Sequence, residues 1–244
     1  MLFKLWRAVA DLLFPRCCEV CGRELLLDEK FLCLDCLAEI PLTYFWLIEE
    51  NPARMALLGR ARVEAVCSLF YYTDSYKKLV HSFKYRSNVK LGMWLGEMLG
   101  SKIPFPADYI IPVPLHWRKE WKRGYNQSKI IAKGVCKGIM RNCICEAGIS
   151  GDKTGNVPIV LNGLLKRRAF TRTQTQKDRA HRWQNVSDAF TIDSKAALKY
   201  NLSGKKVLIL DDVFTTGATL DACANLLLEH FDCKVYIATL AYVE

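Results

Sequence analysis

The chain has 244 residues, of which 51% are apolar and 25% charged, which allows a packed core and excludes a disordered chain. Its net charge is +10, and the excess lies beyond residue 60, because residues 1–60 hold seven Lys and Arg against nine Asp and Glu. No stretch reaches the roughly 18 continuous apolar residues that a transmembrane helix needs. A basic surface suits a polyanionic partner such as nucleic acid or a pyrophosphate compound, or is merely solvated.

The N-terminal stretch MLFKLWRAVADLLFP predicts a short amphipathic helix, because its apolar residues recur at helical spacing. Arg7 and Asp11 interrupt the apolar run, and no small-residue cleavage site follows, which argues against a signal peptide. We expect this helix to pack on the protein, with weak contact with a membrane surface as the alternative. The chain as a whole is predicted to be cytoplasmic.

Five of the eleven cysteines lie close together and form two C-x₂-C pairs, Cys18 with Cys21 and Cys33 with Cys36. Four thiolates at this spacing can bind one Zn²⁺ ion tetrahedrally, and such a closed site is structural rather than catalytic. Cys17 could replace Cys18, and disulfides are the alternative to a metal. Because this region is net acidic, we expect the zinc knuckle to stabilise the fold or dock a protein rather than bind nucleic acid.

Beyond the cysteines, short apolar strands alternate with helices. Strands are predicted over 65–72, 108–113, 157–165, 207–210 and 235–241, and helices over 75–83, 91–99, 126–140 and 219–231. This alternation predicts an α/β fold with a mostly parallel sheet covered on both faces. The polar segments 141–156 and 166–186 are interpreted as loops. We expect three parts: the N-terminal helix and zinc knuckle (1–42), a mixed, hood-like segment (43–105) and the α/β core (106–244).

The string VLILDDVFTTGATL begins at residue 207 and places two acids, Asp211 and Asp212, directly after a buried strand. Ligands of open α/β sheets bind at this edge, and adjacent acids there are costly unless a sugar diol or a metal engages them. The next residues bring small side chains, hydroxyls and a helix N-terminus, which together can hold a phosphate: Thr215, Thr216, Gly217, Ala218 and Thr219. The string therefore predicts a site for a ribose phosphate, and a capped turn with incidental acids is the alternative.

Two basic stretches accompany this motif. IPVPLHWRKEWKRGYNQS (111–128) follows a predicted strand, and KRRAFTRTQTQKDRAHRWQNV (166–186) has seven Lys and Arg against one Asp. Such charge can neutralise a pyrophosphate, although either stretch alone could be a solvated basic face. His116 and His181 lie in these loops and are expected to be surface residues.

Taken in order, CEVCG, CLDC, LVHSFKYRSN, IIPVPLHWRKEWKRGYNQS, TRTQTQ, RWQNVSDAF and VLILDDVFTTGATL resemble the ComF family of competence-associated, amidophosphoribosyltransferase-like proteins. The matching stretches span nearly the whole chain. The last stretch is shared by all type I phosphoribosyltransferases. The combination of the cysteine pairs with PVPL, RGYNQ and TQT is far more specific to the ComF family. The resemblance implies a type I phosphoribosyltransferase fold with a small N-terminal zinc-knuckle module, or double zinc ribbon.

The resemblance also implies 5-phosphoribosyl-1-pyrophosphate (PRPP) with Mg²⁺ as the ligand. Asp211 and Asp212 would be the catalytic acids that hold the ribose diol, and Thr215 to Thr219 would bind the 5-phosphate. The residues that are candidates for binding the pyrophosphate or the acceptor substrate are Lys84, Arg118, Arg123 and Arg182. The loop over 166–186 would close over bound PRPP and shield the reacting ribose from water.

Three functions follow as hypotheses. The first is an enzyme that transfers the phosphoribosyl group of PRPP to an acceptor that the sequence does not name. The second is a non-catalytic factor that binds single-stranded nucleic acid through aromatic residues among cations: Trp117, Trp121, Tyr125, Phe170 and Trp183. The third is a protein adaptor that acts through the zinc knuckle. The resemblance implies a role in DNA uptake during natural transformation, and therefore single-stranded DNA or a DNA-uptake protein as partner.

Overall fold

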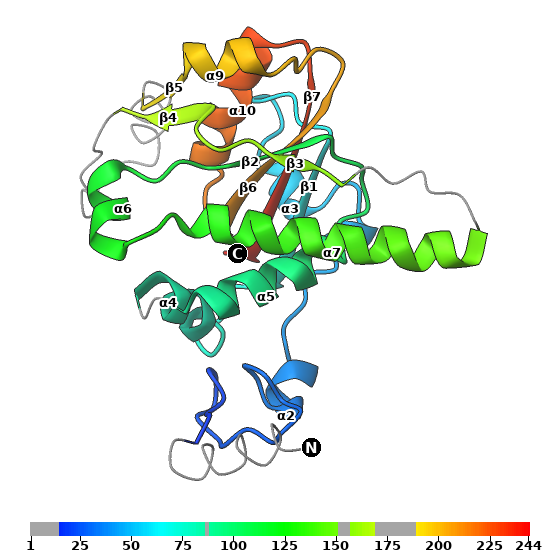
Figure 1. The fold of residues 1–244 in the computed structure, drawn as a ribbon, viewed down its shortest axis with the longest axis vertical. Coiled ribbons are helices and arrows are strands. Elements are labelled where there is room, and N and C mark those ends of the chain that lie inside the picture. Colours follow the sequence, from blue (N-terminus) through cyan, green and yellow to red (C-terminus); the bar gives the residue numbers. More distant parts are fainter. Residues whose placement is uncertain (1–14, 86–87, 151–156, 169–188) are drawn as a thin grey trace.

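A five-stranded parallel sheet forms the centre of the molecule (Figure 1). The computed structural model describes residues 15–85, 88–150, 157–168 and 189–244. The strand order is β1-β7-β6-β2-β3, with bounds β1 (Ala65–Tyr71), β7 (Lys234–Tyr242), β6 (Lys206–Phe214), β2 (Tyr109–Pro112) and β3 (Ile159–Val160). Every neighbouring pair in this sheet is parallel, which confirms the predicted fold class.

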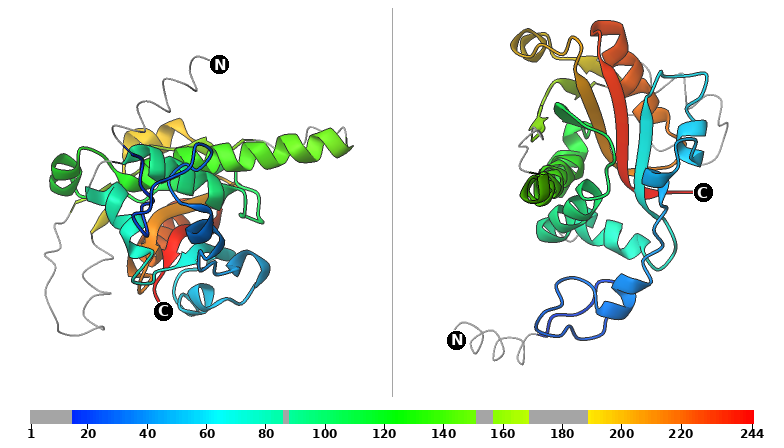
Figure 2. Two further views of the ribbon diagram at one scale, coloured as in Figure 1. Left: turned by 90° about the horizontal axis from the view of Figure 1, so that it is seen from below. Right: turned by 90° about the vertical axis from the view of Figure 1, so that its right-hand side faces the viewer.

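Helices cover both faces of the sheet, so its central strands are apolar on both faces. Along β6, Leu208 and Leu210 pack into one buried cluster, whereas Val207 and Ile209 pack into the other. The first cluster lies under α5 (Val89–Gly100) and α7 (Gln127–Ser150), and the second under α3 (Pro52–Met55) and α10 (Ala218–His230). Figure 2 (right) shows the sheet between these two layers.

Smaller elements surround this core. They are α2 (Leu34–Ala38), η1 (Phe45–Leu47), α4 (Lys77–Tyr85), α6 (Trp117–Arg123), α9 (Ser194–Lys199), and an antiparallel pair formed by β4 (Leu165–Arg167) and β5 (Phe190–Ile192). The segment expected to be hood-like contributes β1, which pairs with β7 in the main sheet. The division of the chain into three parts stays a prediction.

Glycines bring α5 and α7 into backbone contact. A Cβ on Gly96 would lie 2.4 Å from the Ile131 carbonyl oxygen, and one on Gly134 would lie 2.2 Å from the Met93 carbonyl oxygen. No larger residue fits at either position without moving a backbone. This contact fixes how α7 lies across the sheet.

Two predicted boundaries between residues 141 and 165 are wrong. The predicted loop over 141–156 is helical as far as Ser150. At the end of α5, Arg141 pairs with Glu97 and Asn142 Nδ2 donates to the Ser101 carbonyl at 3.0 Å, which holds the start of this extension. The predicted strand over 157–165 is two short strands, β3 and β4, since a turn at Gly163, with φ of 85°, separates them.

The predicted N-terminal helix lies in residues 1–14, outside the described residues. Within the part of the chain that the structure describes, no helix is long and apolar enough to cross a membrane.

Candidate functional site

The two acids of the motif lie inside β6 rather than after it. The predicted end of this strand at residue 210 is wrong, because β7 continues to pair with β6 up to Phe214 and Tyr242. On the other side, β2 leaves β6 after Leu210, where the Val113 N–H makes a last bond to the Leu210 carbonyl at 2.9 Å. Asp211 is therefore hydrogen-bonded to one neighbouring strand only, at the carboxyl-terminal edge of the sheet.

Each acid has a partner from the helical layer. The Ser128 hydroxyl, in the first turn of α7, donates to Asp211 Oδ1 at 3.0 Å. Lys84 Nζ, in the last turn of α4, lies 2.8 Å from Asp212 Oδ2, and these two side chains are only 18% and 16% exposed. The buried Asn126 positions Ser128, because its Oδ1 accepts from the Ser128 N–H at 3.0 Å and its Nδ2 donates to the Val113 carbonyl at 3.0 Å.

Burial, followed by repulsion from Asp212, raises the pKa of the Asp211 carboxyl from 3.8 to about 7. Hydrogen bonds from the Asp212 N–H and from Ser128 act in the opposite direction. Asp211 therefore exchanges a proton near neutral pH. A cation or a diol donor that engages its charged form would lower this pKa again.

The bend after β6 leads directly into α10. Gly217 has a φ of 78°, and a Cβ there would lie 2.8 Å from Phe214 Cζ and 2.9 Å from Leu57 Cδ2, so both conformation and space require glycine. Thr216 Oγ1 receives only a long 3.4 Å bond from the Ala218 N–H. Helix N-termini leave such N–H groups available, and they favour an anion.

A group of four cations forms a second feature, the basic cluster, made of Lys84, Lys119, Arg123 and Arg167. Burial, and then the positive charges of Arg167, Arg123 and Lys84, lower the pKa of Lys119. Arg123 Nη1 also donates to Gln127 Oε1 at 3.0 Å. A polyanionic ligand would relieve the repulsion that Lys119 experiences from the other three cations.

The structure thus brings together two of the four predicted pyrophosphate candidates, Lys84 and Arg123. Arg118 is exposed and lies over the Trp117 ring, 5.1 Å from its centroid. Arg182 and most of the predicted closing loop lie outside the described residues. Lys119 and Arg167 lie in the two basic stretches that the sequence indicates, although neither is among the four named candidates. The helical spacing of Lys119 and Arg123 places both on one helix face.

The sequence predicts a loop after β2, but residues 117–123 form α6. His116 caps this helix by accepting from the Arg118 N–H at 3.2 Å, so the prediction of a surface histidine is wrong: the residue is 4% exposed. Burial, together with the cations Arg118, Arg167 and Lys119, lowers the pKa of His116. Helix α6 presents two exposed indoles one turn apart, Trp117 (64% exposed) and Trp121 (86%).

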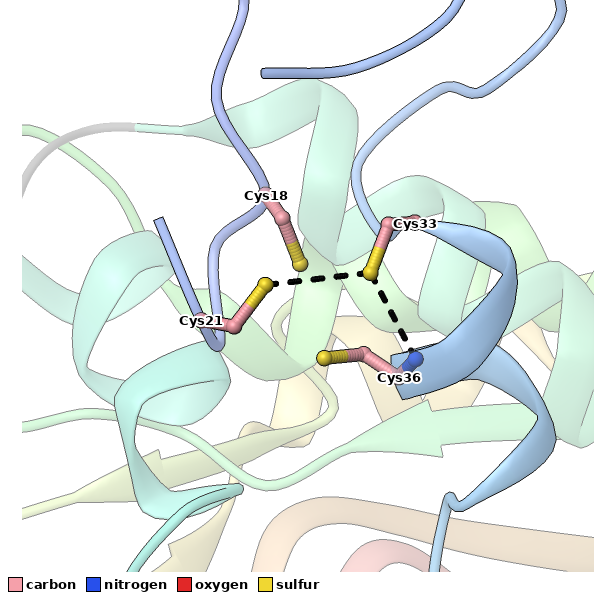
Figure 3. A group of neighbouring side chains, drawn as sticks. All are labelled: Cys18, Cys21, Cys33 and Cys36. Carbon is pink, nitrogen blue, oxygen red and sulfur yellow. Dashed lines mark hydrogen bonds between the residues drawn. The ribbon is translucent and has the colours of Figure 1, made fainter. Parts of the chain in front are cut away.

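The predicted cysteine cluster is present (Figure 3). The Sγ atoms of Cys18, Cys21, Cys33 and Cys36 all lie within 4.8 Å of one another, so they can hold a metal ion. Although burial opposes it, N–H groups of Cys21, Cys33 and Val20 lower the pKa of Cys18 to about 6, which favours a thiolate. The exposed Cys17 is not part of this group, and its Sγ lies 3.7 Å from the Pro15 carbonyl oxygen.

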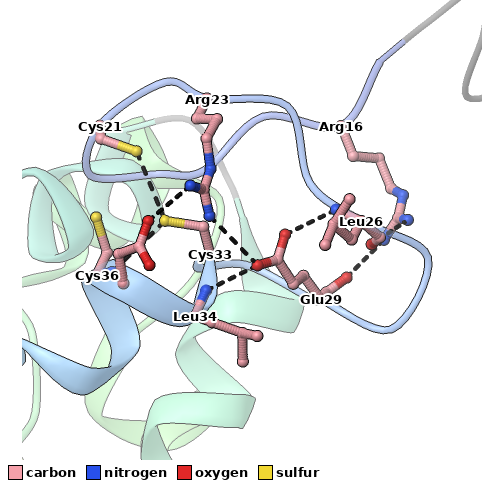
Figure 4. Close-up of polar contacts among 9 residues, drawn as sticks. Arg16, Cys21, Arg23, Leu26, Glu29, Cys33, Leu34 and Cys36 are labelled. Atoms are coloured by element: carbon pink, nitrogen blue, oxygen red, sulfur yellow. Dashed lines mark hydrogen bonds and ion pairs between the residues drawn. The ribbon is translucent and has the colours of Figure 1, made fainter.

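Local hydrogen bonds shape the knuckle around the cysteines (Figure 4). Gly22, with φ of 78°, turns the chain after the first pair, and its N–H donates to the Cys18 carbonyl at 2.9 Å. The buried Glu29 carboxylate accepts from the N–H groups of Leu26 and Leu34, both at 2.7 Å. Glu29 therefore ties the loop between the two cysteine pairs to the start of α2.

Comparisons with known proteins agree with these features. Residues 156–244 match the family model of the phosphoribosyl transferase domain. Competence protein F of Haemophilus influenzae is 26% identical over 223 residues, an alignment that covers 88% of this chain and 79% of the relative's length. DNA utilization protein YhgH of Escherichia coli K12 is 26% identical over 231 residues, which are 90% of this chain and 87% of the relative's length. Competence protein ComFC of Bacillus subtilis is 24% identical over 166 residues, which are 66% of this chain and 57% of the relative's length.

Proposed function

Because the chain is a ComF-type protein with a phosphoribosyl transferase domain and an N-terminal Cys₄ cluster, we propose that it binds PRPP with Mg²⁺ at the acidic pair of β6. The observation that carries the proposal is the position of Asp211 and Asp212 where β2 leaves the sheet, directly before a bend that opens a helix. A ribose phosphate has a diol and a phosphate at opposite ends, which matches an acidic pair next to an N–H-rich bend.

Each part of PRPP has residues suited to it. Asp211 and Asp212 accept from the ribose hydroxyls, and Thr215 to Thr219 bind the 5-phosphate. The basic cluster, with Lys119 and Arg167 in addition to Lys84 and Arg123, neutralises the pyrophosphate. Gln127 supports a ligand here as well, since its buried Nε2 has no hydrogen-bond partner among the described residues.

Mg²⁺ fits the same place, because it prefers oxygen ligands and is commonly held by one or two carboxylates together with substrate phosphates. When bound, it would neutralise charge on the pyrophosphate. In a transfer reaction, the acids orient the ribose and the cations stabilise the leaving pyrophosphate, so the chemistry proposed is pentosyl transfer to a nucleophile that remains unnamed.

The Cys₄ cluster is proposed to hold a structural Zn²⁺ ion. A tetrahedral site with Zn–S bonds of about 2.3 Å places the sulfurs about 3.8 Å apart. The Sγ atoms of Cys21 and Cys33 are 3.7 Å apart. All four protein ligands are cysteines, so no coordination position is left for a substrate.

Calorimetric titration with PRPP tests the ligand. In excess Mg²⁺ the native chain should bind PRPP, and Asp212→Asn should weaken binding about tenfold or more, because hydrogen bonds to charged groups contribute about 1.5–3 kcal/mol. Thr216→Val should weaken it too. Asp232→Asn is the matched control, since Asp232 is exposed and lies just before β7, at the opposite edge of the sheet. Equal affinity of Asp212→Asn and the native chain would refute the assignment.

A second candidate function, binding of single-stranded DNA, is favoured by α6. Its exposed Trp117 and Trp121 lie among cations, and stacking of a base on an aromatic ring is worth about 1–3 kcal/mol. The names of the relatives, competence protein and DNA utilization protein, support a role in DNA uptake for this chain as well. A phosphate-binding site and a stacking surface can operate together.

Fluorescence titration with a single-stranded oligonucleotide tests this function. Affinity should fall steeply between low and moderate salt, and Trp121→Ala should weaken binding about fivefold or more, whereas Trp121→Phe retains most of it. Tyr44→Ala, which removes an exposed aromatic elsewhere, is the control. Affinity that is independent of salt, or equal losses for Tyr44→Ala and Trp121→Ala, would contradict a stacking surface on α6.

A further inference from the structure

A single helix, α4, joins the cysteine cluster to the acidic pair. Its last turn carries Lys84, which pairs with Asp212 at 2.8 Å, and both side chains are mostly buried. The Phe83 carbonyl next to Lys84 accepts from the Tyr125 hydroxyl, so this end of α4 also contacts the segment between α6 and α7. In Figure 1, α4 lies between the knuckle module and the sheet.

The start of α4 is bonded to the metal-binding loops themselves. The Tyr76 hydroxyl, just before the helix, donates to the Cys36 carbonyl at 2.7 Å in a buried contact. Lys78 Nζ donates to the carbonyl of Val20, which lies between Cys18 and Cys21, at 3.2 Å. Each acceptor therefore belongs to a segment whose position a bound metal would fix.

The segment that follows α4 is anchored to the same module. Asn88 Nδ2 donates to Glu19 Oε1 at 2.8 Å, while Asn88 Oδ1 caps α5 by accepting from the Leu91 N–H at 3.1 Å. The rings of Phe31 and Trp94 pack with their centroids 5.5 Å apart. Contacts before and after α4 therefore hold the helix against the knuckle. A shift of the knuckle would move α4 and, with it, Lys84.

From these contacts we infer that metal occupancy of the Cys₄ cluster positions Lys84 beside Asp212 and thereby raises the affinity of the acidic pair for PRPP. The inference rests on the proposed function for its ligand and adds a regulator to that site. Lys84, which also belongs to the basic cluster, carries the position of the knuckle to the site through its pairing with Asp212. Because coupling is reciprocal, PRPP should raise the affinity of the cluster for its metal by the same factor, typically about 5- to 150-fold.

The first experiment needs no PRPP. The full chain is prepared with zinc and after removal of zinc by dialysis against a chelator, and each form is acetylated briefly and analysed residue by residue by mass spectrometry. Removal of zinc should raise the labelling rate of Lys84 about fivefold or more, whereas Lys77, on the same helix and already 46% exposed, should not change. Protection of the buried Cys223 against a thiol reagent reports that the core stays folded.

Tyr76→Phe makes the same test with the metal in place. This variant removes the bond to the Cys36 carbonyl and no cysteine, so zinc content should remain one ion per chain while Lys84 labelling rises. Unchanged Lys84 labelling both in the metal-free chain and in Tyr76→Phe would overturn the inference. If removal of zinc also exposes Cys223, the metal-free chain has lost its core, and zinc-bound Tyr76→Phe decides alone: faster labelling of Lys84 upholds the inference, and unchanged labelling overturns it.

The second experiment measures PRPP affinity in excess Mg²⁺ for the zinc-bound and the metal-free chain. Zinc removal should weaken binding about fivefold or more in the native chain and in Lys77→Met, but not further in Lys84→Met, which has lost the coupled group. Equal losses on zinc removal in all three chains would overturn the coupling. If no form binds PRPP, the proposed function fails, and the labelling results alone decide whether the knuckle positions Lys84.

Discussion

Asp211 is a carboxyl that folding makes less acidic. Its pKa rises from 3.8 to about 7, so the native state keeps a proton over a pH range in which the unfolded chain has lost it. The stabilising contribution is complete below pH 4 or so and is lost as pH rises through about 7. The same carboxyl is therefore a cost to stability at the pH at which its charged form can engage a diol.

Replacing Asp211 with Asn should show this cost. The amide resembles the protonated acid, so the thermal midpoint of Asp211→Asn relative to the native chain should increase from pH 5 to pH 8 in the absence of ligand. Unfolding followed by circular dichroism at several pH values measures it. Midpoints of the two chains that run parallel across this range would contradict the raised pKa.

Ser128 should matter for ligand binding through Asp211. Ser128→Ala removes the 3.0 Å hydrogen bond to Asp211 Oδ1, so the charged carboxylate loses a donor and PRPP affinity should fall about tenfold. Ser101→Ala is a suitable control, because that hydroxyl donates to the Met98 carbonyl in an exposed helix end. A calorimetric titration in which both serine variants bind like the native chain would rule out this role.

The sequence is informative at the residue scale where neighbours in the chain are also neighbours in space. Asp211, Asp212 and the following bend are contiguous, and the two C-x₂-C pairs need only one loop to meet. Ser128 and Lys84 could not be predicted as partners of the acids, because their approach depends on how α7 and α4 pack. Arg167 likewise reaches the basic cluster only through the tertiary fold.

At the scale of elements, the packing of α5 on α7 depends on glycine. Gly96→Ala would place a Cβ 2.4 Å from the Ile131 carbonyl oxygen, and such overpacking costs typically about 1–3 kcal/mol. Gly92→Ala is a matched control in the same helix, because its Cβ would lie 3.4 Å from the nearest atom, Ile130 Cγ2, which is an ordinary van der Waals contact. Alanine also favours a helix by about 1 kcal/mol over glycine.

Chemical unfolding should therefore separate the two variants. The free energy of unfolding is expected to fall for Gly96→Ala and to stay level or rise for Gly92→Ala. Equal changes in both would mean that the helices are free to move apart.

Elements with strong periodicity are predictable, and those set by context are not. The apolar runs of β1, β6 and β7 lie between two helical layers, and their positions follow from the sequence. The far end of α7 and the whole of α6 are polar in sequence, and polar composition by itself favours a loop. In α6, much of the surface meets solvent. The extension of β6 through two acids depends on β7 as a partner strand, which no local pattern reveals.

At the scale of the molecule, the knuckle shares a core with the helical layer rather than standing apart. Cys18, Leu32 and Cys36 belong to the same buried cluster as Leu79 and Phe83 of α4. Loss of the metal should therefore reach the main body of the protein. Through α4 it should also reach the acidic pair of β6.

Removal of zinc is expected to lower the midpoint of the main unfolding transition, because a metal that binds only the folded state stabilises that state. Differential scanning calorimetry of the zinc-bound and metal-free chains measures this, and restoring zinc to the metal-free chain provides the control. If zinc removal left the main transition unchanged and abolished only a separate, smaller transition, the knuckle would be shown to unfold independently of the main body.

The claim on which the account depends is that the acids of β6 and the bend after them hold one phosphorylated pentose. The most direct measurement is a crystal structure of the chain grown with PRPP and Mg²⁺. We predict ribose hydroxyls on Asp211 and Asp212, with 5-phosphate oxygens about 2.7–3.2 Å from the N–H groups and hydroxyls of residues 215–219. PRPP bound elsewhere, with that bend vacant, would contradict the account.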